Sequence, residues 1–197
     1  MANELDGSKI AILAADGVEQ VELTEPRDAV QNAGAETELL SIASGEIQGV
    51  NGEINPADTF SVDKVVADAS VGDYDGLIIP GGVANPDNLR ADPDVITFVQ
   101  EFFKTGKPVG VICHGPWVLI EADVAKGRRL TSYPSIRTDL RNAGAEVVDE
   151  EVVTDAGLVT SRSPDDLPAF CAKIVEEFAE GKHQVHDEGA TAGAASS

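Results

Sequence analysis

The fold is decided by one stretch of the sequence, Gly106-Lys107-Pro108-Val109-Gly110-Val111-Ile112-Cys113-His114-Gly115-Pro116-Trp117. The apolar run over 109–112 follows a Gly/Pro turn and predicts a buried strand, and the Gly-Pro pair after it predicts a helix with proline in its first turn. Cys113 therefore lies where a strand ends and a helix begins. Backbone N–H groups at a helix start favour an ionised thiol, so we expect a nucleophilic Cys113 with a pKa lowered toward neutrality.

The residues beside Cys113 fit this chemistry. His114 can exchange protons near pH 7, and Gly115 tolerates the close backbone approach that such a corner requires. The alternative is that Cys113 is a small core residue, because free cysteine is among the most buried residue types. The G-x-S-x-G elbow of hydrolases is only half matched, since Val111 replaces its first glycine.

Length and composition indicate one domain with a substantial core. The chain has 197 residues, 42% of them hydrophobic, and no apolar run approaches the length of a membrane span. The N-terminal residues include Glu4 and Asp6 and lack the pattern of a signal peptide, so we expect a cytoplasmic protein. Cys113 and Cys171 lie far apart in the sequence, which favours reduced thiols over a disulfide framework or a metal pair.

The charge balance is strongly acidic, with 14 basic against 35 acidic residues and a net charge of −21. Such a surface repels nucleic acid and anionic lipid, so we expect neither nucleic-acid nor membrane binding. Dispersed carboxylates suit a salt-rich, halophilic cytosol, where screening shortens the range of self-repulsion. This hypothesis predicts a melting temperature that rises between low and molar KCl.

Apolar runs alternate with helical patterns along the chain. This order predicts an α/β protein, a three-layer sandwich with a mostly parallel, flavodoxin-like central sheet. The predicted strands cover 9–14, 36–42, 77–79, 109–112, 146–148, 151–154 and 158–161. The predicted helices cover 18–33, 94–105, 117–122, 135–142 and 165–180, with a short one opening at Asn85, a weak one over 61–69 and a hairpin over 44–56.

Three groups of candidate residues follow predicted strands. They are Glu19 and Glu22, the Gly81-Gly82 pair, and Cys113-His114. Ligands of open parallel sheets bind beyond the carboxyl ends of the strands, so these groups are expected to converge on one site. Taken alone, the two glutamates would be ordinary solvated helix residues and the glycine pair a plain tight turn.

The C-terminal region is predicted to divide at residue 181. Residues 1–181 form the domain, and in its last helix Cys171 lies on the apolar stripe and is expected to belong to the core. Residues 182–197 are rich in small and polar types and are predicted to be a disordered tail. His183 and His186 have a metal-like spacing there, but a flexible tail offers no rigid metal site.

The sequence resembles the PfpI family of intracellular cysteine hydrolases, part of the superfamily of the parkinsonism-associated deglycase and the class I glutamine amidotransferase-like domains. The likeness covers roughly residues 8 to 180. It rests on four ordered motifs: Ile79-Pro80-Gly81-Gly82, Ile112-Cys113-His114-Gly115-Pro116-Trp117, Leu130-Thr131-Ser132-Tyr133-Pro134 and Thr160-Ser161-Arg162-Ser163-Pro164-Asp165-Asp166-Leu167-Pro168.

The resemblance implies roles for individual residues. Cys113 matches the nucleophile with His114 beside it, and Glu22 matches a buried glutamate that approaches the sulfur. Glu22 must carry a proton to donate to a thiolate, because two adjacent negative charges raise each other's pKa. Gly82 and the N–H of His114 match the oxyanion donors. Asp87 matches an acid that, in some relatives, reaches the histidine from a neighbouring subunit.

The resemblance also implies a function that needs no cofactor and no metal. We expect a thiol-dependent hydrolase or lyase acting on glyoxal or methylglyoxal adducts of amines (a deglycase) or on free dicarbonyls, within a dimer or hexamer. The alternatives are an intracellular cysteine peptidase and a redox-sensing stress protein or chaperone in which Cys113 is oxidised. A paralogue with a dead site is a further possibility. The amidotransferase mechanism is disfavoured, because only the tail histidines follow Cys113 late in the chain.

Overall fold

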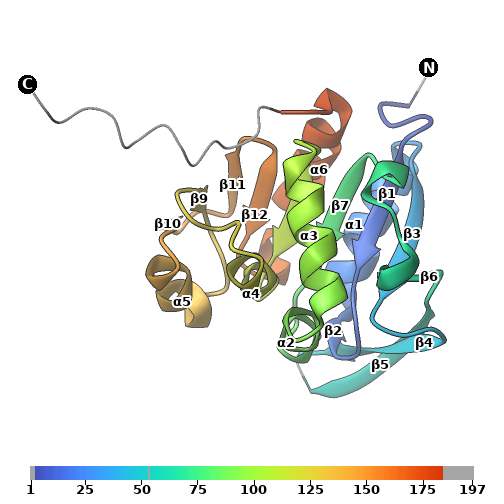
Figure 1. Cartoon of the computed structure of the whole chain (residues 1–197), viewed down its shortest axis with the longest axis horizontal. Helices are drawn as coiled ribbons and strands as arrows, with labels where there is room; N and C mark the ends of the chain where they lie inside the picture. The colour runs from blue at the N-terminus through green and yellow to red at the C-terminus, as the bar shows by residue number, and fades with distance from the viewer. Residues whose placement is uncertain (1–2, 53, 184–197) are drawn as a thin grey trace, which may run out of the picture.

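A computed structural model describes residues 3–52 and 54–183. Its centre is a seven-stranded sheet in the order β11-β12-β8-β7-β1-β3-β6 (Figure 1). Neighbouring strands are parallel except for the antiparallel pair β11 and β12. The strands are β1 Lys9–Leu13, β3 Glu36–Ser41, β6 Lys64–Val65, β7 Gly76–Ile79, β8 Val109–Ile112, β11 Val152–Asp155 and β12 Leu158–Ser161.

The order of the strands in the sheet gives the predicted flavodoxin-like topology. If β1, β3, β7, β8 and β12 are taken in chain order as strands one to five, their order across the sheet is 5-4-3-1-2. This is the flavodoxin-like arrangement, in which sites form beyond the carboxyl ends of the strands where the order reverses. The predicted three-layer sandwich with a mostly parallel sheet is confirmed.

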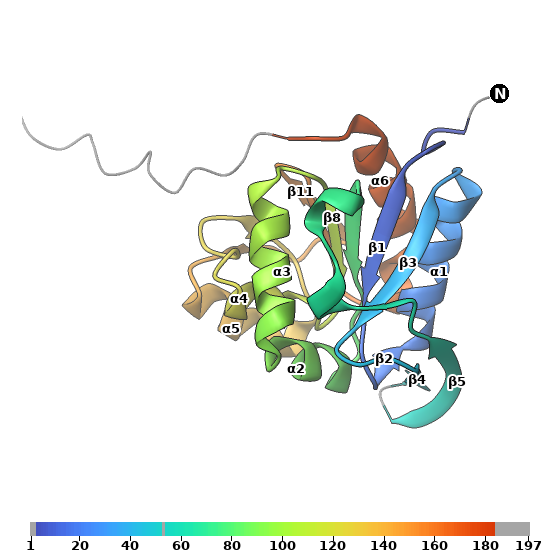
Figure 2. The ribbon, with the colours of Figure 1, turned by 45° about the vertical axis from the view of Figure 1, so that its right-hand side comes forward.

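Helices cover both faces of the sheet, as Figure 2 shows with α3 on one side and α1 and α6 on the other. The face of α1 and α6 buries one apolar cluster, and the face of α2, α3, α4 and α5 buries the other. Both clusters draw on alternate residues of the same strands, which explains why these strands are continuous apolar runs. The helices are α1 Gln20–Asn32, α2 Ala84–Arg90, α3 Pro93–Lys104, α4 Pro116–Glu121, α5 Arg137–Asn142 and α6 Leu167–Glu180.

Strand β8 shows how the two faces are filled. Val109 and Val111 face the cluster under α3, whereas Ile112 faces the cluster under α6. A Cβ atom at Gly110 would lie 2.7 Å from Ile174 Cγ2 of α6. Glycine at this position therefore allows α6 to pack directly on the strand that ends at Cys113.

Smaller elements surround the main sheet. One short sheet has the order β2-β4-β5 and another pairs β9 with β10. Their bounds are β2 Val18–Glu19, β4 Glu46–Asn51, β5 Asn55–Ser61, β9 Arg129–Leu130 and β10 Glu146–Val147. Short 3-10 helices cover Val66–Asp68, Val71–Asp73, Pro134–Ile136 and Pro164–Asp166.

The predicted hairpin is confirmed, but the weak helix predicted over 61–69 is wrong. Strand β5 continues to Ser61, and Lys64–Val65 forms β6 at the edge of the main sheet before the 3-10 turn. Here β6 pairs with the last residues of β3, Leu40 and Ser41. The open edge of β3 supplies backbone partners that outweigh a weak local helix preference.

The first helix begins later than predicted. Val18 and Glu19 pair with β4 as a short strand, and α1 starts at Gln20. The helix then continues through Pro26, which does not restart it. Pro26 lacks the N–H that would bond the carbonyl of Glu22 one turn earlier. The missing hydrogen bond is therefore in the turn that contains the candidate residue Glu22.

Within the part of the chain that the structure describes, no helix has the length and apolar character needed to cross a membrane. The described part ends at His183, two residues past the predicted domain boundary. Gly181 ends α6 with a φ of 80°. The N–H of His183 then donates to the carbonyl of Gly106 over 2.8 Å. His186 and the rest of the predicted tail lie outside the described residues.

Candidate active site

Cys113 lies at the corner between β8 and α4, as predicted. Its backbone is left-handed, with a φ of 63°, a conformation that is strained for a non-glycine residue. Two hydrogen bonds fix this corner: the Cys113 N–H donates to Ser161 O over 3.1 Å, and its carbonyl accepts from Tyr133 N–H over 2.9 Å. The strain and the two bonds together aim the thiol into a pocket at the sheet edge.

His114 is buried beside Cys113, and its ring is fixed on several sides. Its Nδ1 atom lies 3.2 Å from Cys113 Sγ, and its Nε2 atom lies 3.0 Å from Ser135 Oγ. The ring stacks on Tyr133 with centroids 4.5 Å apart. Ser135 was not predicted, because a lone serine just after the Leu130–Pro134 motif has no pattern of its own. The Ser135 hydroxyl group fixes the ring of His114, which lies between this hydroxyl and the Cys113 sulfur.

Glu22 occupies the first turn of α1 and is fully buried beside the sulfur. Its Oε2 atom accepts the Gly81 N–H over 2.7 Å, and its carboxyl group is close enough to raise the pKa of the Cys113 thiol. A Cβ atom at Gly81 would lie 2.5 Å from Glu22 Oε2 and 2.6 Å from Cys113 Cβ. Only glycine lets the two chemical groups approach over this turn.

The predicted oxyanion donors also converge on the sulfur. The backbone N–H groups of Gly82 and His114 lie near Cys113 and favour its ionised form, which lowers the pKa of the thiol. Gly82 has a φ of 81°, and a Cβ atom there would lie 2.4 Å from Gly17 O. Glycine is therefore required both by the backbone conformation and by space.

The predicted lowering of the Cys113 pKa is wrong for the thiol in this environment. Burial is the largest influence and raises the pKa, and the Glu22 carboxylate raises it further. The N–H groups of Gly82 and His114 act in the opposite direction. The sequence indicated these donors but not the depth of burial. Thiol and carboxyl form a coupled pair in which one negative charge is favoured over two.

The pocket above the sulfur has a volume of about 180 Å³. It is lined by two acidic residues, Glu19 and Glu22, together with Gly52, Gly82, Cys113, Tyr133 and Pro164. Glu19 is held there because its Oε1 atom accepts the Gly52 N–H over 3.0 Å. The hairpin residue Gly52 and the loop residue Pro164 were not predicted as pocket walls.

Asp87 is not brought to His114 within the chain. Its side chain is 57% exposed on α2, and Oδ1 accepts from Arg90 Nε at 2.9 Å and from Arg90 Nη2 at 2.6 Å. Arg90 in turn stacks over Trp117 at 4.5 Å from the ring centroid. The role predicted for Asp87 across a subunit interface stays a prediction.

Cys171 behaves as expected for a residue of the apolar stripe. It is half-buried on α6 and packs against the cluster under that helix. Burial, with a smaller contribution from the charge of Glu25, raises the pKa of its thiol to about 12. Cys171 is therefore a protonated packing residue at neutral pH, away from the pocket.

Comparison with known proteins agrees with this geometry. Residues 8–177 match the DJ-1/PfpI family. The chain belongs to the DJ-1/PfpI family. Uncharacterized proteins of Staphylococcus haemolyticus and Staphylococcus aureus are 46% and 45% identical to it over 173 residues, which is 86% of this chain and 97% and 98% of theirs. The family match over residues 8–177 includes every strand of the central sheet and every candidate site residue.

Solved structures show that the DJ-1/PfpI fold is shared in detail. Drosophila melanogaster DJ-1beta superposes with a TM-score of 0.79 at 28% identity, covering 87% of this chain and 90% of that one. A two-domain Anabaena variabilis protein with DJ-1/ThiJ/PfpI-like and ferritin-like domains gives a TM-score of 0.81 at 36% identity over 86% of this chain. This DJ-1/PfpI chain spans 47% of the length of that protein.

Proposed function

We propose that this DJ-1/PfpI protein is a Cys113-dependent hydrolase or lyase that acts on glyoxal or methylglyoxal, either free or as adducts of amines. One observation carries the proposal. Four groups lie around a single sulfur: an imidazole at 3.2 Å, a buried carboxyl group, and two backbone N–H donors. Such a set supplies a nucleophile, a proton carrier and stabilisation for a developing oxyanion.

The chemistry follows from the positions of these groups. The thiol proton passes to His114 or Glu22 as the sulfur bonds to the aldehyde carbon, and the carbonyl electrons move to oxygen. The N–H groups of Gly82 and His114 face the sulfur and stabilise that oxygen. Glu22 then moves the carbon-bound proton to the neighbouring carbon through an enediol, which gives a thioester. Water hydrolyses the thioester to a 2-hydroxy acid. These reaction steps are redox-neutral overall.

With an amine adduct, attack by the sulfur leads to release of the amine. The sulfur bonds to the carbon of the hemiaminal, and the carbon–nitrogen bond breaks as His114 returns a proton to the leaving amine. The thiohemiacetal that remains follows the route above. His114 suits both steps because its ring lies between the sulfur and the Ser135 hydroxyl.

The pocket size favours a small carbonyl compound over a peptide. Its volume of about 180 Å³ lies below the range of roughly 300 to 1,000 Å³ that is usual for sites of drug-sized ligands. A two- or three-carbon dicarbonyl fits, and the amine of an adduct can extend through the open side. The acidic wall formed by Glu19 and Glu22 favours neutral or cationic groups over anionic ones.

A second function draws on the same donors. Two backbone N–H groups aimed at Cys113 Sγ would also stabilise a sulfinate, which supports a redox-sensing stress protein. The two functions can be distinguished by whether the protein consumes substrate. The sensor needs oxidation of Cys113 and no consumption of substrate.

Loss of methylglyoxal, followed with wild type, Cys113→Ser and Cys171→Ser, tests the proposal. We expect turnover in wild type and Cys171→Ser and none in Cys113→Ser. Equal turnover in Cys113→Ser removes the enzymatic proposal. Absence of turnover in every variant, together with a peroxide-induced sulfinate on Cys113 in wild type detected by mass spectrometry, supports the sensor instead.

A further inference from the structure

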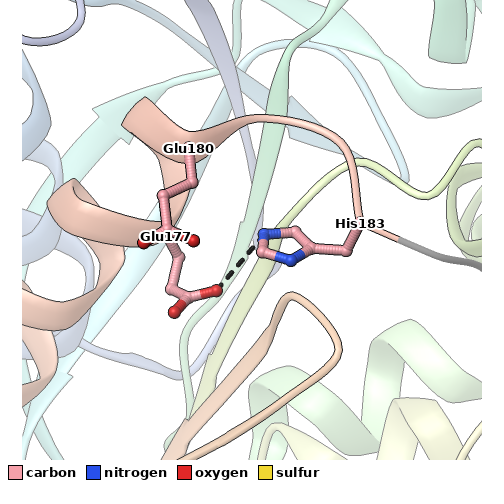
Figure 3. A group of neighbouring side chains, drawn as sticks. All are labelled: Glu177, Glu180 and His183. Carbon is pink, nitrogen blue, oxygen red and sulfur yellow. Dashed lines mark ion pairs between the residues drawn. The ribbon is translucent and has the colours of Figure 1, made fainter.

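A second cluster of metal-ligating side chains lies at the C-terminal end of α6. Glu177, Glu180 and His183 each offer one ligand atom, and these atoms lie within 4.8 Å of one another. Figure 3 shows the Glu177 carboxylate facing the ring of His183, with Glu180 from the next turn above it. The cluster adjoins Gly106, which precedes β8, whereas Cys113 follows β8. It is therefore separate from the thiol site.

The backbone fixes His183 in place. Its N–H donates to Gly106 O over 2.8 Å, and its ring packs so closely on Gly157 that a Cβ atom there would lie 2.6 Å from Cδ2. Gly157 has a φ of 81° and so suits glycine on conformational grounds as well. The imidazole is held on a built surface rather than on a free tail.

The two facing atoms are buried and form an ion pair that lacks hydrogen-bond geometry. Glu177 Oε2 and His183 Nε2 are each inaccessible to solvent, and neither has a hydrogen-bond partner among the described residues. They lie 3.3 Å apart, and the Glu177 side chain is only 9% exposed. Because this contact is not a hydrogen bond, an ion bound by both atoms would satisfy them better than they satisfy each other.

The spacing of these atoms suits a metal ion. Ligand atoms bound to Zn²⁺ at about 2.0 Å in a tetrahedron lie roughly 3.3 Å from one another. The observed separation of Nε2 and Oε2 is 3.3 Å. Glu180 is exposed and can rotate to supply a third oxygen, which leaves a fourth position for water.

The donor set also restricts the metal. An imidazole with carboxylates suits Zn²⁺ and its first-row neighbours, whereas Ca²⁺ and Mg²⁺ prefer oxygen alone. Lys173, a cation on the same helix, bonds Glu176 over 2.6 Å. Lys173 is therefore engaged outside the cluster.

We propose that Glu177, Glu180 and His183 form a binding site for one divalent transition-metal ion of the Zn²⁺ class. The ion would join the end of α6 to the turn at Gly106 that leads into β8. Its role is structural: it fastens the chain after α6 to the sheet. This proposal is independent of the chemistry at Cys113.

Titration of Zn²⁺ into the EDTA-dialysed full chain by calorimetry tests the site, and Co²⁺ reports the coordination geometry through its visible absorption. We expect one ion per chain and a tetrahedral Co²⁺ spectrum. Glu177→Gln and His183→Gln should each weaken binding by at least about tenfold. Glu176→Gln is the matched control on the same helix turn and should change affinity less than about twofold.

Two further variants keep the outcome decisive. Glu180→Gln changes an exposed side chain, so loss of affinity with an unchanged melting temperature shows a ligand rather than a folding defect. Cys113→Ser should bind Zn²⁺ like wild type. Absence of stoichiometric binding, full affinity in His183→Gln, or loss of binding in Cys113→Ser would each overturn the proposal and leave only an ion pair between Glu177 and His183.

Discussion

Nδ1 of His114 lies 3.2 Å from Sγ of Cys113, the residue before it in the chain. Adjacent residues seldom present their side chains to one another, and here the left-handed backbone of Cys113 makes the contact possible. The other ring nitrogen is held by Ser135. A nucleophile and its proton carrier thus depend on one strained corner and one hydroxyl group.

Ser135→Ala is expected to reduce turnover without unfolding the protein. The hydroxyl bonds His114 Nε2 over 3.0 Å, and a single hydrogen bond of this kind contributes about 0.5 to 1.5 kcal/mol, or roughly a two- to tenfold fall in kcat. Steady-state kinetics on methylglyoxal measure this effect. Ser44→Ala, at an exposed turn, is the control and should leave kcat unchanged. Equal rates for both variants would show that Ser135 does not orient the ring.

Glu22→Gln is expected to separate thiol reactivity from turnover. The Glu22 carboxylate raises the pKa of Cys113, and an amide removes that charge while keeping a donor beside the sulfur. The midpoint of Cys113 alkylation by iodoacetamide should therefore move to lower pH, whereas turnover should fall because an amide cannot carry a proton. The pH profile is measured with Cys171→Ser as background. A midpoint that moves to higher pH would contradict the electrostatic coupling.

Gly81→Ala is expected to damage both stability and activity. The new Cβ atom would lie 2.5 Å from Glu22 Oε2 and 2.6 Å from Cys113 Cβ, so the turn or the two side chains must move. Overpacking of this kind costs about 1 to 3 kcal/mol of unfolding free energy. Urea denaturation and methylglyoxal turnover report the two losses. Gly72→Ala is the control, because there a Cβ atom would meet only Ser70 Oγ, at 3.5 Å. A Gly81→Ala protein with wild-type stability would be evidence against the close approach.

Asp87 is expected to act across a subunit interface. Among residues 3–52 and 54–183, its side chain pairs only with Arg90, at an exposed position, so Asp87→Asn should change stability by less than about 1 kcal/mol. We expect its turnover to fall. Mixing Asp87→Asn with Cys113→Ser subunits should then restore activity above that of either variant, because each mixed interface of a symmetric assembly joins an intact Cys113 to an intact Asp87. If mixing restores nothing while Asp87→Asn alone is inactive, the interface role is wrong.

The sequence alone was sufficient to predict the strands that are buried on both faces of the sheet. The strands that end at Leu13, Ile79 and Ile112 are apolar runs because two helical layers cover them, and the same runs are visible without coordinates. The short edge strand Lys64–Val65 was missed, because its formation depends on the free edge of β3 rather than on its own residues.

At the site, the residue types could be predicted but their environment could not. Cys113, Glu22 and Gly82 are marked by motifs, whereas Ser135 is a single hydroxyl placed by a loop. The thiol pKa depends on how deeply the corner is buried, and a linear pattern does not encode depth. His183 looked like part of a polar tail, since its hydrogen bond to Gly106 joins residues that are distant in the sequence.

The two outermost strands of the central sheet have a consequence for behaviour at high concentration. Strand β6 has only two residues, one of them Lys64, and the opposite edge strand β11 is four residues long and follows the acidic run Asp149–Glu151. Short, charged rims offer little template for another chain to add a strand. The rims of the central sheet therefore disfavour amyloid-type addition of a second chain to this sheet.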